Sequence, residues 1–453
     1  MPTTAVALFT RDLRVHDNPT LSAAAAAGRV VPLFVLDRAI LGGRFNRPNR
    51  AAFLAGALAD LDSSLRDLGA ALVVRAGAVV AEVSAVVAEV GATEVHVSGD
   101  ASGYARRRQH TLAQRLKAEA VELHVHDDAT AVVPPGAVQP AGSDHYAVFT
   151  PYHRAWSRVD VPPPLRAPPS LAMPRVRAGS LPAAADICRG DVAPDLPEPG
   201  ETAGRAALDR WLRTGIDGYE DGHDTLADDA TSRLSPYLHF GCLSAREIAR
   251  RASRSSSSAA EAFVRQLAWR DFNGQVLAAR PDASRQDYRP RGDCWRHSAK
   301  DLAAWQEGRT GYPIVDAGMR QLVREGWMHN RARLITASFL TKTLYLDWRA
   351  GAEFFLAHLV DGDVANNQLN WQWVAGTGTD TRPNRVLNPL LQAKRYDPDG
   401  DYVRRYVPEL ADLEGAAIHE PWKAQDLFRT VDYPPPIVDL DEGRRRFLAA
   451  RKG

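Results

Sequence analysis

Cysteine is scarce in this sequence, with three residues among 453: Cys188, Cys242 and Cys294. Their wide separation argues against both a disulfide scaffold and a cysteine-ligated zinc site, and it is typical of a protein of the reducing cytoplasm. A long hydrophobic run is also missing, because the amino-terminal AVALFT continues directly into the charged RDLRVHD. We therefore expect a cytoplasmic protein that is neither exported nor inserted into a membrane, and we expect no bound metal.

An excess of one charge is likewise absent. The sequence has 56 Lys and Arg against 55 Asp and Glu, which excludes a uniformly basic nucleic-acid binder but leaves room for a local basic patch. What the sequence does have is length and apolar content, because 45% of its 453 residues are hydrophobic. A chain of this length exceeds one ordinary core, so we expect a globular enzyme with two domains of different kinds.

Residues 1–130 alternate short apolar segments with amphipathic ones, which predicts a doubly wound α/β domain with a parallel sheet. The expected strands are Ala5–Thr10, Val30–Leu36, Ala71–Arg75 and Glu94–Ser98, and the expected helices include Arg50–Leu68 and Val79–Val90. Such domains bind ligands beyond the carboxyl ends of their strands, here near Thr10–Asp12, Leu36–Arg38 and Ser98–Asp100. Neither a GxGxxG nor a Walker motif occurs there, which disfavours an ordinary dinucleotide-dependent dehydrogenase or a P-loop enzyme.

Residues 131–200 are rich in proline, and we expect them to form an extended, irregular connector between the domains, with one short helix at Phe149–Trp156. Residues 201–453 show helical periodicity almost throughout, which predicts an all-α domain. Its clearest predicted helices are Glu261–Leu277 and Met319–Leu344. The serine run Ser253–Ser258 is expected to connect two helices.

The segment Trp327–Trp373 contains four tryptophans, and two aspartates that flank Gly362. A single large aromatic residue is usually part of a core. Several easily oxidised indoles on one face of an electron-accepting cofactor would instead form a redox relay. The segment alone leaves both interpretations open.

Five stretches, taken in order, resemble the photolyase/cryptochrome flavoprotein family, most closely its bacterial cyclobutane pyrimidine dimer photolyases. They are LFTRDLRVHDNPTL at Leu8–Leu21, TSRLSPYLHFG at Thr231–Gly241, AWRDF at Ala268–Phe272, WQEGRTGYPIVDAGMRQL at Trp305–Leu322, and the segment Trp327–Trp373. The resemblance implies that residues 1–130 bind an antenna chromophore and that residues 201–453 form an all-α domain for FAD and DNA.

The resemblance implies flavin contacts for Tyr219, Thr231, Ser232, Arg233, Leu234, Ser235, Arg270, Asn330, Arg333, Asp361, Asp363 and Asn367. Hydroxyls and amides of the Thr231–Ser235 turn would meet the phosphates, although such residues are also typical of a simple helix cap. Arg333 and Asp361 match an ion pair beside the flavin ring. Asn367 matches the residue that faces flavin N5, where an amide, unlike a carboxylic acid, supplies no readily transferable proton.

Trp371, Trp348 and Trp295 match the family's chain of three tryptophans, which carries electrons between the flavin and the surface. Asp363, Asn367 and Trp371 recur every four residues, so a helix would place them along one stripe. Trp305 and Trp327 are expected to be core residues.

The resemblance also implies a substrate pocket, in which Trp269 and Trp373 would stack on a flipped-out pyrimidine dimer. Three positions depart from the bacterial pattern: Gln266 replaces a glutamate that hydrogen-bonds the dimer, Leu334 replaces a methionine, and His223 replaces an arginine. Glutamine at this position is also found in six-four photolyases. Against that alternative, Asn330 and Leu334 occupy the places of the histidine pair that six-four enzymes use for proton transfer.

Contacts to DNA phosphates are expected from a local concentration of basic residues that the net charge conceals: Arg331, Lys342, Arg382, Arg385, Lys394, Arg395, Arg404 and Arg405. The antenna site is expected at Phe34, Asp37, Arg50 and Asp100. Arg107 and Arg108 stand where folate-binding members carry Asn and Glu, so a deazaflavin is the preferred chromophore and folate is disfavoured.

The resemblance therefore implies a monomeric enzyme, without an obligate protein partner, that splits pyrimidine dimers in damaged DNA with light and FAD. The alternatives are a cryptochrome-type blue-light photoreceptor, a six-four photolyase, and a flavin-binding electron-transfer protein. About forty residues follow Pro408–Leu410, and this is shorter than the tail that signalling members usually carry.

Overall fold

The computed structural model of the protein describes residues 3–423 and 432–451. The chain forms two compact units, each with most of its contacts within itself. Unit 1 comprises residues 1–192, 197–217 and 232–281, and unit 2 comprises residues 193–196, 218–231 and 282–453. These bounds differ from the three segments expected from composition, because several helices after residue 200 belong to the same unit as the sheet.

Unit 1 is built on a sheet of five parallel strands in the order β3-β2-β1-β4-β5. The strands are β1 (Thr3–Phe9), β2 (Gly28–Asp37), β3 (Val73–Gly77), β4 (Glu94–Ser98) and β5 (Glu122–His126). The strand order reverses between β1 and β4, as in other doubly wound sheets. The four expected strands are present, which confirms the α/β fold of the first part of the chain. The expected set lacked β5, whose polar sequence ELHVH offers no apolar run.

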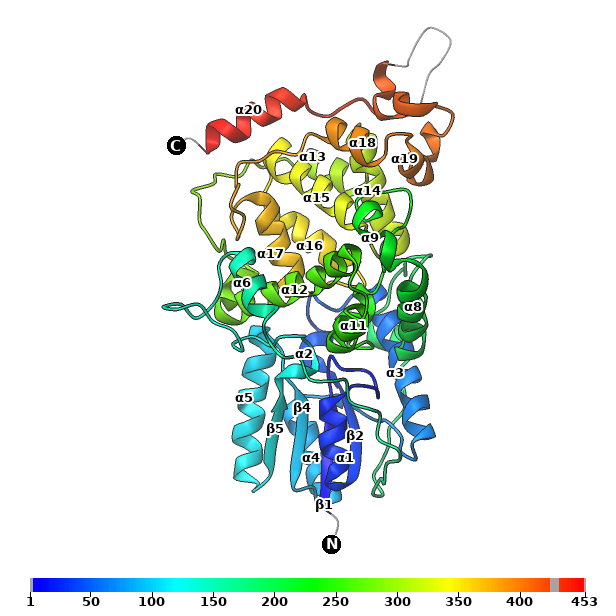
Figure 1. The fold of residues 1–453 in the computed structure, drawn as a ribbon, viewed down its shortest axis with the longest axis vertical. Coiled ribbons are helices and arrows are strands. Elements are labelled where there is room, and N and C mark those ends of the chain that lie inside the picture. The colour runs from blue at the N-terminus through cyan, green and yellow to red at the C-terminus, as the bar shows by residue number, and fades with distance from the viewer. Residues whose placement is uncertain (1–2, 424–431, 452–453) are drawn as a thin grey trace. The chain divides into compact units, whose positions relative to one another are not determined.

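Helices cover both faces of this sheet. Valines of β1, β2 and β4 pack against α4 and α5 in one buried cluster, and α1 lies on the opposite face (Figure 1). The helices of unit 1 are α1 (Pro19–Ala26), α2 (Arg38–Leu41), α3 (Pro48–Asp67), α4 (Val79–Val90), α5 (Gly103–Ala118), α6 (Phe149–Trp156), α7 (Ala184–Ile187), α8 (Glu201–Thr214), α10 (Ser235–Phe240), α11 (Ala245–Ala252) and α12 (Ser258–Ala279). Helix α6 has the bounds expected from the sequence.

Local signals fix several of these helices. The Asn18 side chain caps α1 by accepting a hydrogen bond from the backbone N–H of Leu21, and Pro19 supplies a backbone angle suited to the first helical position. Helix α4 ends at Val90 and is capped by Gly91, whose φ of 62° is the left-handed conformation that glycine adopts without strain.

The proline-rich residues 131–200 contain α6 and α7 and are otherwise largely irregular, as expected. Up to residue 192 they run along unit 1. The backbone N–H groups of Val30 and Val74 each donate a 2.8 Å hydrogen bond to this segment, at Ala172 and Ala178 respectively. The segment therefore satisfies backbone groups of the sheet strands.

Three buried acidic residues attach the later helices of unit 1 to its sheet. Arg246 of α11 forms a buried ion pair with Asp17. Glu201 of α8 accepts a 2.7 Å hydrogen bond from the backbone N–H of Val15. Asp271 of α12 accepts hydrogen bonds from the backbone N–H groups at residues 132 and 133 and from the Trp156 indole. These contacts explain why α8, α11 and α12 belong to the unit with the sheet.

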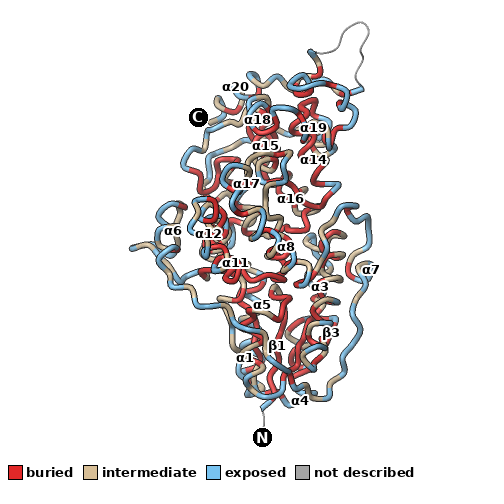
Figure 2. The backbone as a smooth tube through the Cα atoms, turned by 45° about the vertical axis from the view of Figure 1, so that its right-hand side comes forward, coloured by how far each residue is buried: buried red, intermediate tan, exposed pale blue. Residues whose placement is uncertain are grey.

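All regular secondary structure among the described residues of unit 2 is helical. Its helices are α9 (Tyr219–Gly222), α13 (Ala299–Gln306), α14 (Pro313–Glu325), α15 (Asn330–Ser338), the π-helical η4 (Phe339–Thr343), α16 (Trp348–His358), α17 (Val364–Ala375), α18 (Pro389–Tyr396), α19 (Asp401–Tyr406) and α20 (Leu440–Ala450). Short 3-10 turns complete the chain: η1 (Asp127–Ala129), η2 (Ile216–Gly218), η3 (Pro281–Ser284), η5 (Pro408–Leu410), η6 (Gly415–His419) and η7 (Pro421–Lys423). Helix α14 and strand β1 are buried along most of their length (Figure 2).

The expectation of one continuous helix over Met319–Leu344 is wrong. Helix α14 ends at Glu325 and is followed by Gly326, which has a φ of 60°, and α15 begins at Asn330 after a four-residue break. The chain then widens into the π-helical turn η4. Glycine in the left-handed conformation ends a helix even where the apolar periodicity continues on both sides.

Among the described residues, no helix is both long and apolar enough to span a bilayer.

Candidate functional site

In unit 2, helix α17 carries the residues that matched the flavin ring. Asp363 caps this helix by accepting a 2.9 Å hydrogen bond from the backbone N–H of Asn366. Asn367 and Trp371 follow one turn apart, and both are buried. The Asn367 amide donates a 3.0 Å hydrogen bond to the carbonyl of Ala352 on α16, and this contact fixes the direction of its side chain. The four-residue spacing therefore gives one helical stripe, as expected.

Arg333 and Asp361 form the expected ion pair, with 2.8 Å between the Arg333 Nη2 and the Asp361 Oδ2. The Arg333 guanidinium also donates a 2.8 Å hydrogen bond to the carbonyl of Met328. The other carboxylate oxygen, Asp361 Oδ1, is buried and accepts no hydrogen bond from the described residues. A buried carboxylate oxygen without a donor is costly, so this atom suits a ligand that brings an N–H or O–H group.

The turn Thr231–Ser235 spans the boundary between the units, since Thr231 belongs to unit 2 and Ser232 to unit 1. Within unit 1, Arg233 has a φ of 50°, and α10 begins two residues later. Within unit 2, the Thr231 hydroxyl is buried, and among the described residues it has no hydrogen-bond partner. Tyr219, also in unit 2, is buried and stacks on His223 with 4.9 Å between ring centroids.

The three tryptophans of the expected chain lie in unit 2 and differ in exposure. Trp371 and Trp348 are buried, and Trp295 is half-buried. The Trp348 indole donates a 2.8 Å hydrogen bond to Asp287, and Trp295 lies 5.0 Å from Tyr345 between ring centroids. Of the three, only Trp295, the proposed end of the chain, is more than slightly exposed. Trp305 and Trp327 are buried, which confirms their assignment to the core.

In unit 1, the predicted substrate residues Gln266, Trp269 and Arg270 lie on α12. Gln266 is exposed, and Trp269 is half-buried. One face of the Trp269 indole is covered by Phe149, with 3.7 Å between the ring centroids and only 4° between the planes. Arg270 donates a 2.6 Å hydrogen bond to the carbonyl of Thr130, which holds the helix beside the end of the sheet domain.

In unit 2, the predicted substrate residue Trp373 is half-buried at the end of α17, and the Arg385 guanidinium lies 5.1 Å from its ring centroid. Leu334 is half-buried against the core, and Asn330 is exposed at the start of α15. Trp269 belongs to unit 1, and Trp373 belongs to unit 2.

The predicted basic patch is only partly available to a polyanion. Arg382, Arg385, Lys394, Arg395 and Arg405 are exposed. Lys342, by contrast, is buried and donates to two backbone carbonyls, at 2.7 and 2.8 Å, so its expected contact with phosphate is wrong. Burial lowers the pKa of Lys342 to about 7.

Arg331 is paired with an acidic residue that the sequence did not suggest. Its guanidinium forms a bidentate ion pair with Asp224, with two distances of 2.6 Å. It also lies over the ring of Tyr396, and Arg395 lies over the same ring. The charge of Arg331 is thus largely compensated, whereas the charge of Arg395 faces solvent.

The expected antenna residues lie in unit 1 near the carboxyl ends of the strands. Asp37 and Arg50 are buried, and Phe34 is largely buried. The Tyr104 hydroxyl donates a hydrogen bond to Asp37, and burial raises the pKa of Tyr104 to about 12. The sequence had not pointed to this tyrosine.

Charged groups surround the two acidic residues of this antenna region. Asp100 pairs with Arg11 at 3.2 Å. Arg108 lies 3.7 Å from Asp37. The carboxylates are therefore held in a buried polar setting at the end of the sheet where doubly wound folds bind ligands.

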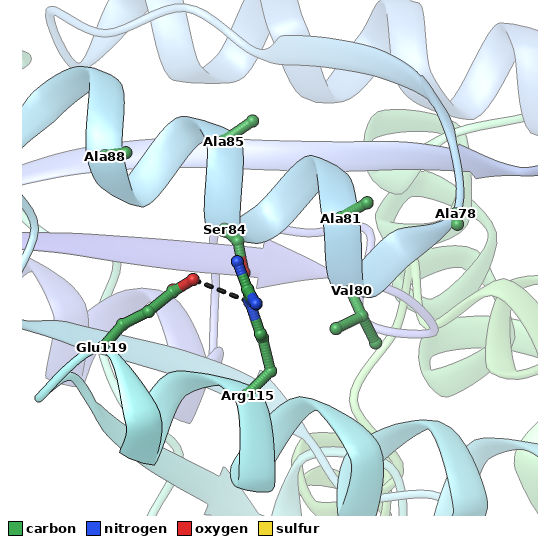
Figure 3. A pocket seen from close by; sticks show the side chains of 8 residues that line it. All are labelled: Ala78, Val80, Ala81, Ser84, Ala85, Ala88, Arg115 and Glu119. Carbon is green, nitrogen blue, oxygen red and sulfur yellow. Dashed lines mark hydrogen bonds and ion pairs between the residues drawn. The ribbon is translucent and has the colours of Figure 1, made fainter.

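A separate groove of about 620 Å³ lies between α4 and α5. Figure 3 shows its alanine-rich lining and the ion pair between Arg115 and Glu119 at one side. None of the site residues predicted from the sequence lines this groove.

Phe149, Asp287 and Asp224 support predicted site residues but were missed by sequence reasoning. Phe149 lies in a segment whose helix was predicted, yet nothing in that pattern indicates which ring it covers. The two aspartates are separated from their partners by 61 and 107 residues, and local patterns carry no signal at such distances.

Two family models and a curated relative match this chain. A family model described as "DNA photolyase" matches residues 5–170, and one described as "FAD binding domain of DNA photolyase" matches residues 263–453. A deoxyribodipyrimidine photo-lyase from Streptomyces griseus is 57% identical over 450 residues, with 99% of each chain covered.

Two solved structures resemble the whole chain. A bacterial class III photolyase from Agrobacterium tumefaciens is 35% identical with a TM-score of 0.93, and the match covers 100% of this chain and 98% of that one. A cryptochrome from Synechocystis is 28% identical with a TM-score of 0.91, and the match covers 100% of this chain and 99% of that one.

Proposed function

Because the chain belongs to the DNA photolyase family, we propose that it splits cyclobutane pyrimidine dimers in DNA with light, using FAD as its cofactor. The observation that carries this proposal is the 57% identity to the Streptomyces deoxyribodipyrimidine photo-lyase over 99% of both chains. The proposed reaction is a lyase reaction: two carbon–carbon bonds of the dimer break, and the transferred electron returns, so no net oxidation occurs.

The residues of unit 2 fit a bound flavin dinucleotide. When bound, FAD would supply light absorption and the electron. Two buried oxygens, Asp361 Oδ1 and the Thr231 hydroxyl, lack hydrogen-bond partners among the described residues. Asp361 Oδ1 would accept a hydrogen bond from the ligand, and the Thr231 hydroxyl would donate one to it. Arg333 would keep Asp361 ionised beside the ring through the 2.8 Å ion pair. Asn367, held by the Ala352 carbonyl, would face the ring with an amide that offers no readily transferable proton.

The substrate would be held by stacking. Phe149 covers one face of Trp269, which leaves the other face of the indole for a flipped-out base. Trp373 is the second proposed stacking residue. Gln266 is exposed on α12 and would hydrogen-bond the dimer through its amide, without the charge of a carboxylate. Arg382 and Arg395, both exposed, are the proposed phosphate contacts.

The antenna residues of unit 1 support a second, light-harvesting chromophore. We propose a deazaflavin rather than a folate, held near Phe34, Asp37, Arg50 and Asp100. A buried carboxylate with a tyrosine hydroxyl and arginines beside it can bind the polar groups of an aromatic chromophore. We further propose that the protein acts as a monomer in the cytoplasm.

The test is a photorepair assay. Purified enzyme with reduced FAD is mixed with an oligothymidine that contains cyclobutane dimers, and blue light should restore the absorbance of intact thymine. Trp269→Ala should weaken binding of the damaged strand by about 1–3 kcal/mol and leave binding of undamaged DNA nearly unchanged.

The control separates the enzyme from the photoreceptor. A protein whose flavin is photoreduced normally, but which never restores thymine absorbance under light, would be a photoreceptor of the cryptochrome type. Repair of six-four photoproducts in place of cyclobutane dimers would redirect the proposal to the other lesion.

A further inference from the structure

One face of the sheet in unit 1 carries a row of histidines that the proposed repair reaction does not use. Glu94 and His96 are two residues apart on β4, and His124 pairs with His96 on the neighbouring strand β5. Successive side chains of a strand point to opposite faces. Val95 and Val97 pack with α4 and α5, so Glu94 and His96 face the other side of the sheet, where α1 lies.

The ligand atoms of these three side chains converge. His96 Nε2 and His124 Nε2 each lie 3.4 Å from Glu94 Oε2, and all three atoms lie within 4.8 Å of one another. A tetrahedral zinc ion with bonds of about 2.0–2.1 Å separates its ligand atoms by about 3.3–3.4 Å. Two of the three separations therefore already match the edge of a zinc coordination tetrahedron.

The histidine nitrogens that face this point are unsatisfied. His96 Nε2 and His124 Nε2 are both buried, and neither has a hydrogen-bond partner among the described residues. The His96 side chain is only 6% exposed, so bulk solvent hardly reaches its ring nitrogen. Buried polar atoms without partners are rare in folded proteins, and a bound ion is one of their ordinary explanations.

A neighbouring histidine orients the buried ligand. His96 Nδ1 lies 3.1 Å from His126 Nε2. A hydrogen bond donated by His96 Nδ1 leaves its Nε2 lone pair directed at Glu94 and His124. Metal-binding histidines usually use their second nitrogen in this way, which fixes the tautomer and the ring direction.

We propose that Glu94, His96 and His124 bind one divalent late first-row transition metal ion of the zinc class. Two imidazoles and one carboxylate suit this class of ion, and a water would complete the tetrahedron. The side chains of Glu94 and His124 are 24% and 34% exposed, which gives the ion an entry path. The His96 and His124 rings are nearly parallel, 17° apart, so binding requires a rotation of the more exposed His124 ring toward the ion.

The ion would link the edge strand β5 to β4, because its ligands come from both strands. Strand β5 is the last strand of the sheet, and its short polar sequence buries little apolar surface. A metal shared between the two strands would stabilise this edge by mass action, independently of FAD and of light. The initial expectation of no metal was based on cysteine spacing, which carries no information on a site made of histidine and carboxylate.

The test uses the full-length flavoprotein after treatment with a chelator. Calorimetric titration with zinc should give one site per chain, and copper(II) should give an electron paramagnetic resonance spectrum with hyperfine coupling to two nitrogens. His124→Ala should weaken zinc binding at least ten-fold and abolish the two-nitrogen pattern. His126→Ala should weaken binding about ten- to hundred-fold because it removes the orienting hydrogen bond.

The matched control is His110→Ala, which removes an exposed histidine of α5 outside the cluster and should leave binding unchanged. Glu94→Gln retains the shape of the glutamate and tests the site even where an alanine variant folds poorly, because it should also weaken zinc binding at least ten-fold. The proposal is overturned by a wild-type protein without stoichiometric zinc binding, or by binding that is equal in wild type, Glu94→Gln and His124→Ala.

Discussion

Trp305 meets Trp371 edge to face, with 6.0 Å between ring centroids and 74° between ring planes. Both indoles are buried in the core of unit 2, and Trp305 donates a 3.0 Å hydrogen bond to the carbonyl of Thr336. Only Trp371 matches the family's electron-carrying chain. Two neighbouring tryptophans with similar burial are therefore assigned different roles, and this contrast can be tested directly.

Trp371→Phe should stop photoreduction of oxidised FAD, because phenylalanine is much harder to oxidise than tryptophan, while chemically reduced enzyme should still repair dimers. Trp305→Phe should leave photoreduction intact and lower the free energy of unfolding by about 1–3 kcal/mol, through a small cavity and the lost hydrogen bond. Flash photolysis and urea unfolding measure the two effects. Equal loss of photoreduction in both variants would contradict the assigned roles.

Gly351→Ala should disturb Trp371 from the neighbouring helix. A methyl group at Gly351 on α16 would lie 2.2 Å from Cη2 of Trp371, so the indole must move. Overpacking of this kind costs about 1–3 kcal/mol of unfolding free energy, and we expect slower photoreduction because the ring is displaced.

The matched control is Gly274→Ala on α12, where an added methyl group meets nothing within 4 Å. Alanine is the better helix former, so this variant should be neutral or more stable by up to about 1 kcal/mol. A Gly351→Ala protein as stable and as readily photoreduced as wild type would show that the α16–α17 contact is looser than the structure indicates.

Asp271 should make stability depend on pH. Burial raises the pKa of Asp271 to about 6 in the folded protein, from an ordinary value of 3.8. Between these values the folded protein holds a proton that the unfolded chain has released. The contribution of Asp271 to the free energy of unfolding is therefore fully present below about pH 4 and is lost as the pH rises through about 6.

Asp271→Asn keeps an oxygen to accept the hydrogen bonds from Trp156 and the backbone, but it cannot ionise. Relative to wild type, the variant should gain roughly 1–3 kcal/mol of unfolding free energy between about pH 4 and pH 7. Urea unfolding at several pH values measures this difference. A constant difference between the two proteins across this range would show that Asp271 does not titrate there.

Two arginines over the Tyr396 ring should contribute unequally to DNA binding. Arg395 is exposed, whereas the charge of Arg331 is matched by the bidentate ion pair with Asp224. Arg395→Ala should reduce the slope of log K against log salt by about 0.9, the value of one phosphate contact on duplex DNA, and Arg331→Ala should reduce it by clearly less. Fluorescence anisotropy at several salt concentrations measures both slopes. A larger reduction for Arg331→Ala would reverse this ranking.

Local features of the sequence predicted much of this fold. The helix at Phe149–Trp156, the first four strands and the stripe of Asp363, Asn367 and Trp371 all follow from short-range periodicity and capping, which depend on neighbours within a few residues. The break at Gly326 was missed because apolar periodicity continues across it. Strand β5 was missed because an edge strand with polar alternation differs little from a loop.

Contacts between distant residues could not be predicted in the same way. Lys342 is of a residue type that commonly contacts DNA phosphates, yet its side-chain nitrogen is buried against the carbonyls of Pro383 and Arg385. The Arg331–Asp224 pair and the cover of Phe149 over Trp269 depend on segments that meet only in the folded chain. Residue type and spacing identify such side chains as candidates, but the tertiary partners decide how much charge or ring surface remains available.

The hydrogen bonds of Asp271 bear on how the protein is made. Its carboxylate satisfies the backbone N–H groups at residues 132 and 133 and the Trp156 indole. A ribosome releases those groups more than a hundred residues before α12 emerges. Until synthesis has passed residue 271, these groups have no partner on α12, and one side of the domain is incomplete. A gene fragment that stops at residue 192 would encode a product prone to aggregation, and chaperones that shield nascent chains should matter most during this interval.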